Sequence, residues 1–396
     1  MKNDRDVVVL SAVRTAVGKY GGALRHIPPT ELGAAVLRES VKRAGIAPDE
    51  AGQVVFGNVI HTEAKDMYFA RVAAVQGGVP VRAPCLTVNR LCGSGLQAIV
   101  SAAQSIRLGE TNVAVAGGAE SMSRAPYWIP GLRWGQHMNN AAAMDVMVGA
   151  LTDPFDEVHM GLTAENIARK WGISRVEQDE FSVESHRRAL DAIHHCKFKA
   201  QIVSMELKVK GGHVTFSTDE SPRVDATFEN LAKLKPVFDK DGTVTAGNAS
   251  SINDGAAALV LMDKRTAETR GLKPLGRLVD CTIVGVDPKY MGIGPVPAVR
   301  ELLRRVGLSL EAIDIIELNE AFAAQALAVM RDLGLPSSRT NPNGSGISLG
   351  HPIGATGAIL AVKLLHELRR IGGRYGLVTM CIGGGQGIAA LFETMH

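Results

Sequence analysis

Cysteine is scarce in this chain, and its spacing argues against structural zinc and against a disulfide framework. The 396 residues include five cysteines, at positions 85, 92, 196, 281 and 381. Their number is odd and no two form a CxxC pair, so both kinds of site are poor fits. Most free cysteines are small buried hydrophobic residues, so each has to be judged from its surroundings.

The sequence also lacks a large net charge and long apolar runs. Its formal charge of +3 is too close to neutral to predict binding to nucleic acid or to a membrane surface. No run approaches the roughly 18 apolar residues that a membrane helix needs. The start, MKNDRDVVVL, resembles neither a secretory signal nor a transit peptide, and the end, FETMH, is no peroxisomal signal. We therefore expect a cytoplasmic protein.

Composition and length indicate a folded protein with at least two packed domains. Hydrophobic residues make up 46% of the chain and charged residues 21%, as in ordinary globular proteins. Single cores stop growing near roughly 250–300 residues, and this chain is longer. Short β-branched runs at 7–10 and 53–60 alternate with a helical pattern at 30–45, which predicts an α/β fold.

The second half of the chain repeats segments of the first. Residues 297–322 run nearly in register with 39–59, and residues 353–385 match 91–120. Both members of the longer pair have a Gly-rich turn, a helical pattern, a turn and a strand that ends in glycines. An internal duplication of one α/β unit explains this better than chance.

The stretch from about 120 to 247 differs from both halves. It carries Trp128, Trp134 and Trp171 among many polar turns, so we expect a loop-rich insertion over one face of the duplicated core. The predicted division is 1–119 with 248–272 for the first half, 120–247 for the inserted domain and 273–396 for the second half.

Cys92 stands out in the segment VNRLCGSGLQAI, at a predicted strand-to-helix turn. Gly93 and Gly95 permit tight backbone geometry there. The helix N-terminus favours a thiolate, so we expect the thiol pKa to lie below the usual value of about 8.5. The alternative is a buried cysteine that caps a turn.

Three other segments also place reactive side chains where a predicted core strand gives way to a turn. His351 lies in GHPIGATGA, for which the alternative is a surface histidine. Cys381 precedes three glycines in CIGGGQG, whose backbone N–H groups can approach a ligand closely. The glycines do not fit the dinucleotide fingerprint, which opens a helix. Asn319 lies in NEAFAAQ, where a helix N-cap is the alternative.

Together these four residues suit chemistry on thioesters, since ligands collect at strand ends of α/β sheets. One thiolate can attack an acyl thioester while histidine accepts its proton, and a second thiol can handle the proton of a carbon acid. An amide and backbone N–H groups can stabilise the oxyanion.

The same segments resemble the thiolase family (acetyl-CoA C-acyltransferases) from end to end of the chain. NRLCGSG, NEAF, GHPIGATG and CIGGGQG are similar to four family motifs in their order and approximate spacing, and HMGLTAENIA and TVTAGNAS are thiolase-like too. The resemblance implies a duplicated core in layers αβαβα, an inserted loop domain for CoA binding and oligomerisation, and a dimer or tetramer. The segment APYWIPGLRW could serve that assembly.

The resemblance also implies residue roles. Cys92 would take the acyl group, His351 would activate it, and Cys381 would remove the α-proton of the incoming acetyl thioester. Asn319 would hold a water that forms one oxyanion hole with His351, and the N–H groups of Cys92 and Gly383 would form the other. No metal or redox cofactor is implied, and coenzyme A thioesters are the substrates.

For coenzyme A, the resemblance implies a set of contacts mostly in the insertion. A basic residue near the nucleotide is physically reasonable, although Arg223 could equally be a solvated charge, and Phe238 and Phe322 could be core packing. The implied contacts are His159, Met160, Arg223, Phe238, Ala246, Ser250, Met291, Ala321 and Phe322.

One position departs from the family pattern. Ser251 stands where family members often have glycine; if the site needs a positive φ, serine would be strained by on the order of 1 kcal/mol.

Two other functions are alternatives to a thiolase. A ketoacyl synthase would decarboxylate a malonyl thioester and would not need Cys381. An inactive binding or scaffold protein would need none of the reactive groups. HMGLTAEN and the overall pattern resemble biosynthetic, short-chain β-ketothiolases more than long-chain degradative ones.

Overall fold

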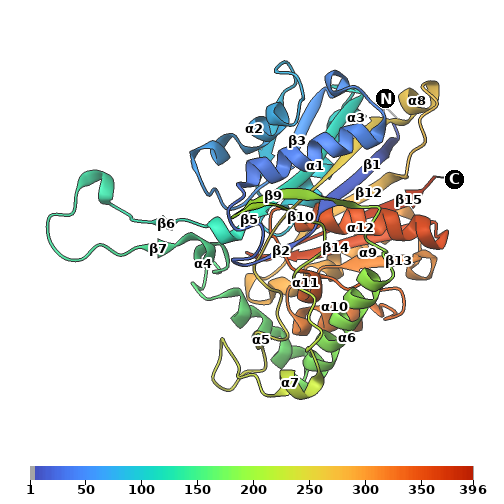
Figure 1. The fold of residues 1–396 in the computed structure, drawn as a ribbon. Coiled ribbons are helices and arrows are strands. Elements are labelled where there is room, and N and C mark those ends of the chain that lie inside the picture. Colours follow the sequence, from blue (N-terminus) through green and yellow to red (C-terminus); the bar gives the residue numbers. More distant parts are fainter. Residues whose placement is uncertain (1–4, 396) are drawn as a thin grey trace.

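One mixed β-sheet runs through the computed structural model, which describes residues 5–395 (Figure 1). Its main strands are β1 (Val7–Thr15), β3 (Gln53–Gly57), β4 (Cys85–Val88), β5 (Val113–Ser121), β11 (Asn253–Asp263), β12 (Gly276–Gly285), β13 (Ile315–Leu318), β14 (Tyr375–Ile382) and β15 (Gln386–Thr394). They follow the order β13–β14–β15–β12–β1–β11–β5–β3–β4. Two short strands, β2 (Gly18–Lys19) and β8 (Ile202–Val203), pair beside this path with β11 and β1.

The two halves of the sheet repeat one pattern of strand pairing. In the first half, β1 pairs antiparallel with β11, β11 antiparallel with β5, and β5 parallel with β3. In the second half, β12, β15, β14 and β13 follow the same succession. The halves meet where Val7–Val9 pairs with Gly276–Leu278. The predicted internal duplication is confirmed.

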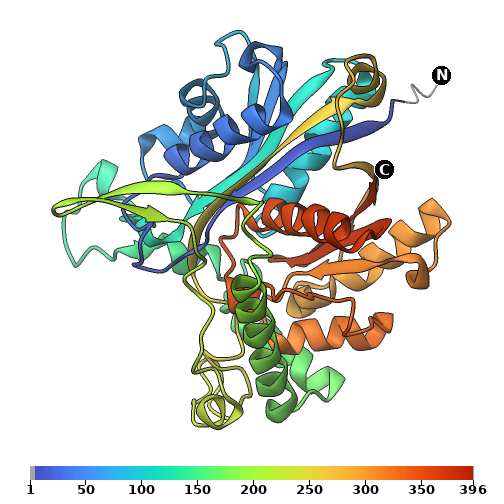
Figure 2. The ribbon, with the colours of Figure 1, turned by 45° about the vertical axis from the view of Figure 1, so that its right-hand side comes forward.

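Helices form three layers around the two half-sheets (Figure 2). The outer face of the first half is covered by α1 (Pro29–Ala44) and α2 (Phe69–Gln76), and that of the second half by α9 (Pro295–Val306) and α10 (Ala323–Leu333). Between the halves lie α3 (Ser94–Leu108) and α12 (Thr356–Ile371). The layers therefore run αβαβα.

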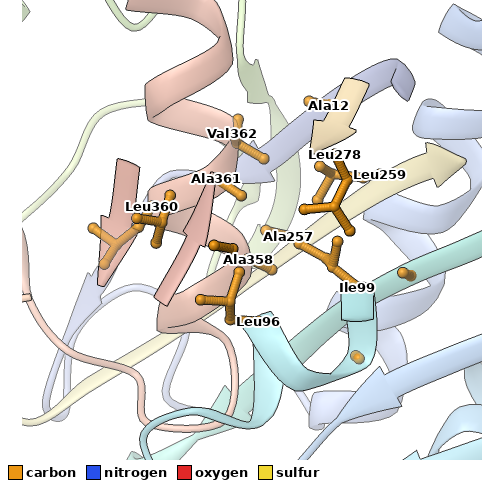
Figure 3. Packing of buried hydrophobic residues seen from close by; sticks show 14 of the residues in the cluster. Ala12, Leu96, Ile99, Ala257, Leu259, Leu278, Ala358, Leu360, Ala361 and Val362 are labelled. Atoms are coloured by element: carbon orange, nitrogen blue, oxygen red, sulfur yellow. The ribbon is translucent and has the colours of Figure 1, made fainter. Parts of the chain in front are cut away.

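The strands are buried on both faces because their alternate residues face two different cores. In β1, Val7 and Val9 pack into the central core with α3 and α12, whereas Val8 and Val13 pack outward under α1 and α2. Figure 3 shows the central core, in which side chains of α3 and α12 meet, among them Leu96 from α3. This explains why the sequence shows continuous β-branched runs instead of alternation with polar residues.

Two glycines bring the central helices into close contact at their first turns. A Cβ added at Gly95 of α3 would lie 2.8 Å from the backbone nitrogen of Ala358. One added at Gly357 of α12 would lie 2.4 Å from that of Leu96. A side chain at either position would push the helices apart. The close contact sets the N-terminal turns of α3 and α12 against each other.

The insertion between β5 and β11 supplies helices around one end of the core and an arm that extends away from it (Figure 1). The arm carries β6 and β7 at its base, and Trp134, in the segment between these strands, is 83% exposed. Within residues 5–395, no helix has the length and apolar character needed to cross a membrane. The elements are β6 (Tyr127–Trp128), β7 (Met144–Asp145), α4 (Val146–Ala150), α5 (Met160–Trp171), α6 (Arg175–His194), the hairpin β9 (Met205–Val209) and β10 (Gly212–Phe216), and α7 (Phe228–Ala232). Outside the insertion lie two further short helices, α8 (Lys264–Thr269) and α11 (Gly346–Leu349).

Candidate active site

A cavity of about 480 Å³ opens between the duplicated core and the insertion. Apolar side chains dominate its lining, which suits an organic ligand with a few polar contacts. Most of the residues singled out in the sequence line it, namely Cys92, His159, Met160, Phe238, Ala246, Ser250, Met291, Ala321, Phe322, His351 and Gly383. Asn319, Cys381 and Arg223 do not line it directly.

A tight, hydrogen-bonded turn holds Cys92 between β4 and α3. The residue before it, Leu91, has a φ of 44°, and its backbone N–H donates to Asn89 Oδ1 at 2.9 Å. Ser94 Oγ donates to the carbonyl of Leu91 at 2.7 Å and accepts from the N–H of Arg90 at 2.8 Å. A leucine in this left-handed conformation costs free energy that the surrounding bonds must offset. The turn therefore fixes where the thiol points.

The pKa of Cys92 lies above the usual value for a thiol, whereas the sequence predicted a pKa below it. Burial raises the pKa of this thiol to about 11, although the N–H groups of Gly383 and of Cys92 itself act against the rise. The expected lowering of this pKa was wrong, because desolvation of the anion outweighs the stabilisation by these backbone N–H groups. A thiol with this pKa needs a base to become a nucleophile.

His351 is a buried histidine in the turn before α12, so the alternative of a surface histidine was wrong. Its Nδ1 lies 2.7 Å from Thr356 Oγ1, which donates its own proton to the carbonyl of Pro352 at 2.9 Å. The network therefore assigns the Nδ1 proton to His351 and leaves a lone pair on Nε2. Burial lowers the pKa of His351 to about 4, so the ring is neutral near pH 7. Such a ring can accept a proton through Nε2.

Replacing Thr356 by valine is expected to lower turnover by about tenfold or more, because the Nδ1 proton loses the acceptor that fixes the ring and its tautomer. Thr356→Ser is the matched control, since it keeps the hydroxyl and should retain most of the rate. Steady-state kinetics of both variants check this. Equal rates for the two variants would contradict a role of the hydroxyl.

Asn319 follows β13 directly and lies within reach of His351. Its Nδ2 is 3.4 Å from His351 Nε2, and its buried Oδ1 has no hydrogen-bond partner among the described residues. The N-cap alternative was wrong, because Phe322 occupies the N-cap position of α10. A buried amide oxygen without a partner is rare and marks a place where a small polar group can bind.

Cys381 lies at the end of β14, fully buried behind the cavity wall and close enough to Cys92 for the two to interact electrostatically. Burial and the neighbouring Cys92 raise its pKa. The loop that follows has positive φ at Gly384 and Gly385, and a Cβ at Gly385 would lie 2.3 Å from a backbone oxygen. The glycines are therefore required for the loop that presents the N–H of Gly383.

The two aromatic residues predicted for coenzyme A both pack against neighbours and line the cavity. The rings of Phe238 and His159 stack with centroids 4.5 Å apart, and Phe238 meets Phe322 edge-on at 6.4 Å. His159 caps α5 by accepting the N–H of Gly161 at 3.0 Å. Phe238 and Phe322 can therefore pack against their neighbours and also contact a ligand in the cavity.

Two other residues lie differently from their predicted setting. Arg223 pairs with Asp225 at 3.1 Å and lines a smaller cavity, which shares Ala246 with the main one. Ser251 does not adopt a positive φ, so the condition under which serine would be strained is not met. Its hydroxyl instead bonds Asn253 Oδ1 at 2.9 Å.

Sequence reasoning missed Glu120, a buried carboxyl group on β5. Its two oxygens accept from Asn58 Nδ2 and from the N–H groups of Val59, Ile60 and Gly354, at 2.8–3.1 Å. Burial nevertheless raises the pKa of Glu120 to about 8. The carboxylate ties β5 and the loop after β3 to the GHPIGATG turn. The sequence GGAES gave no sign of it, because its donors are mainly backbone groups.

The family description "Thiolase, N-terminal domain" matches residues 7–265, and "Thiolase, C-terminal domain" matches residues 272–394. The chain belongs to the thiolase family. Its thiolase relatives include the beta-ketothiolase BktB of Cupriavidus necator, 63% identical over 98% of this chain and 99% of the relative. An acetyl-CoA acetyltransferase of Pseudomonas aeruginosa is 50% identical over 97% and 98%.

Solved thiolase structures have the same fold. The acetyl-CoA acetyltransferase of Bacillus anthracis superposes with a TM-score of 0.97 at 48% identity, covering 99% of both chains. Human mitochondrial 3-ketoacyl-CoA thiolase in complex with CoA superposes at 0.96 and 42% identity, covering 99% of this chain and 98% of that one. The chain is thus an enzyme of an acyltransferase family, and a ketoacyl synthase is set aside.

Proposed function

We propose that this thiolase joins acetyl-CoA to a second acetyl-CoA or short acyl-CoA, reversibly, to give 3-ketoacyl-CoA and CoA. The observation that carries the proposal is the meeting of four reactive side chains from separate segments: Cys92 and His351 line one cavity, Asn319 contacts His351, and Cys381 interacts with Cys92. The relatives named beta-ketothiolase and acetyl-CoA acetyltransferase support the short-chain, biosynthetic assignment. The human relative in complex with CoA supports acyl-CoA and CoA as ligands.

In the first half-reaction, His351 Nε2 accepts the thiol proton as Cys92 attacks the thioester carbonyl. The C–S bond to coenzyme A then breaks, and the departing thiolate takes the proton of Cys381. The products are acyl-Cys92 and free CoA. The N–H groups of Cys92 and Gly383, which already act on the resting sulfur, are donors for the oxyanion.

In the second half-reaction, the thiolate left at Cys381 removes the α-proton of acetyl-CoA. The enolate attacks the carbonyl of acyl-Cys92, a C–C bond forms, and the thiolate of Cys92 leaves with the proton held by His351. All three groups return to their starting protonation. A water on Asn319, together with His351, would stabilise the enolate oxygen, which gives the unpartnered Oδ1 a function.

We further propose how this enzyme binds its carrier, how it assembles and where it acts. The cavity-lining members of the predicted coenzyme A set, with Arg223 at the edge, would hold the carrier, and no metal or redox cofactor takes part. The exposed Trp128 and Trp134 support assembly into a dimer or tetramer through the arm. We also propose the domain division predicted from the sequence, with boundaries after residues 119, 247 and 272. A cytoplasmic location is proposed on the sequence pattern alone.

The test is CoA-dependent cleavage of 3-ketoacyl-CoA substrates of increasing length. We expect turnover that is highest for the shortest chains and falls with each added pair of carbons. A flat profile would favour a degradative thiolase of broad range. Absence of turnover at every length from a folded protein, with no acyl group on Cys92 by mass spectrometry, would favour an inactive binding or scaffold protein.

A further inference from the structure

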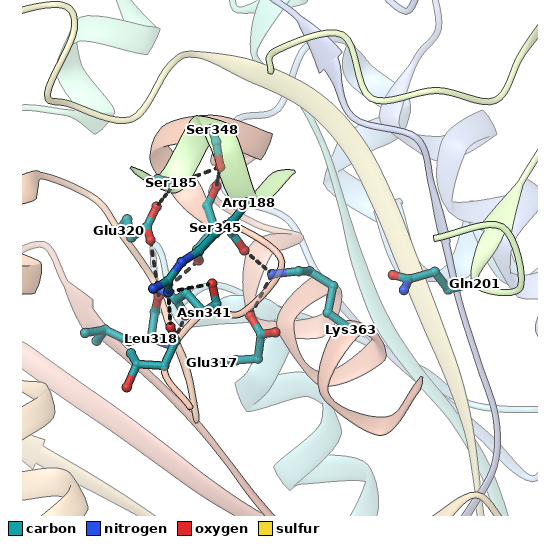
Figure 4. Close-up of polar contacts among 12 residues, drawn as sticks. Ser185, Arg188, Gln201, Glu317, Leu318, Glu320, Asn341, Ser345, Ser348 and Lys363 are labelled. Carbon is teal, nitrogen blue, oxygen red and sulfur yellow. Dashed lines mark hydrogen bonds and ion pairs between the residues drawn. The ribbon is translucent and has the colours of Figure 1, made fainter. Parts of the chain in front are cut away.

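A buried polar cluster joins the segment that follows β13 to α6 of the insertion (Figure 4). Its centre is Glu320, the residue after Asn319, which is 1% exposed. The partners of Glu320 come from two places: residues 341–348, which lead to the His351 turn, and Ser185 of α6. The mechanism above uses none of these groups directly.

Three hydrogen-bond donors hold the Glu320 carboxylate. Oε1 accepts from Asn341 Nδ2 at 2.8 Å, and Oε2 accepts from Ser185 Oγ at 2.6 Å and from the N–H of Ile347 at 3.3 Å. Burial raises the pKa of Glu320, and these donors act against the rise by stabilising its ionised form. Hydrogen bonds to a buried carboxylate are stronger than neutral ones, so each donor fixes its position.

The same cluster holds the backbone on both sides of the Asn319 amide. Asn341 accepts the N–H of Leu318 and donates to its carbonyl, both at 2.8 Å. A Cβ added at Gly346 would lie 2.6 Å from the Glu320 carbonyl and 2.8 Å from Asn319 Oδ1, so this segment is pressed against the amide. The orientation of Asn319 therefore depends on how residues 341–347 lie.

Ser185 is the point where the insertion enters this cluster. It is 3% exposed, and its oxygen also lies 2.8 Å from Ser348 Oγ, between Glu320 and α11. The preceding helix, α5, starts with Met160 in the cavity wall. The two consecutive helices of the insertion thus contact the ligand cavity and the support of Asn319.

We propose that Ser185 is a positioning residue: through Glu320 its hydroxyl holds the Asn319 amide in the orientation that the carbon–carbon step requires. This rests on the proposed function, in which Asn319 serves the enolate of the second half-reaction. The acyl transfer to Cys92 uses the other oxyanion hole and does not depend on Ser185.

The test compares Ser185→Ala with Ser182→Ala. Both serines are buried in α6, but Ser182 Oγ donates only to the carbonyl of Gln178 in its own helix, at 2.8 Å. We expect Ser185→Ala to lower kcat for condensation about 3- to 30-fold, with KM changed less than about twofold, because a displaced catalytic group slows the bond-forming step. The rate of Cys92 acetylation by acetyl-CoA, followed by mass spectrometry, should stay at the wild-type value. Ser182→Ala should match the wild type in all three.

A second comparison tests whether Ser185 acts through Asn319. In an Asn319→Ala background, Ser185→Ala should lower kcat no further, because the group that it positions is gone. Identical kinetics for the two serine variants, or equal losses in acetylation and condensation, would overturn the proposal. Failure of the wild-type protein to acetylate Cys92 at all would instead overturn the proposed function.

Discussion

Replacement of Cys92 by alanine is expected to lower CoA-dependent cleavage of 3-ketoacyl-CoA by roughly 10⁴-fold or more, because the acyl-enzyme intermediate forms on this thiol. The turn around Cys92 is held by bonds from Arg90 and Ser94, so the variant should fold. Mass spectrometry after incubation with acetyl-CoA should find no acetyl group on the variant. Initial rates of thioester loss measure the effect.

Cys281→Ala is the matched control for this experiment. Cys281 is also a partly buried free cysteine, but it lies on β12, outside the cavity lining. We expect this variant to keep its activity. If the Cys92 variant retained turnover within tenfold of the wild type, covalent catalysis through this thiol would be ruled out.

Replacement of Cys381 by serine is expected to separate the two half-reactions. Condensation should fall by about 10³-fold or more, because a hydroxyl is a far weaker acid than a thiol and cannot exchange the α-proton at this site. Cys92 should still become acetylated, since a thiolate leaves a tetrahedral intermediate without much help. Rapid-quench detection of acetyl-Cys92 alongside the steady-state rate measures both effects in one sample.

The size of the Cys381 side chain has to be controlled as well. Cys381 is completely buried beside Met160 and Met291, so a change of volume could disturb the wall of the cavity. Cys381→Ala should show the same separation as Cys381→Ser if the thiol proton is what matters. Condensation at a normal rate in either variant would remove Cys381 from the proton transfer.

The fold was predictable from sequence because its signals are local and repeated. Strands with both faces buried read as β-branched runs, and the match of 353–385 to 91–120 gave the duplication that strand pairing confirms. The arm around Trp134 and the hairpin of β9 and β10 were not foreseen. Their positions depend on contacts with distant segments, which leave no periodic pattern in the residues themselves.

The candidate site likewise contains residues that the sequence revealed and residues that it did not. Cys92, His351 and Cys381 were found because each lies in a short motif at the end of a strand. The pKa of Cys92 was predicted with the wrong sign, since burial by segments far along the chain decides it. Ser185 could not be found at all: it is 135 residues from Glu320, in a helix whose sequence looks ordinary.

The close contact at Gly95 and Gly357 places equivalent turns of the two repeats beside each other. In the repeat, Gly354 occupies the position equivalent to Cys92, and Asn89 the position equivalent to His351, at matching distances before α3 and α12. The crossing helices present both copies of this turn to each other. The thiol of Cys92 and the imidazole of His351 therefore come from the two copies of one turn, at positions that are not equivalent, and each copy supplies only one of the two groups.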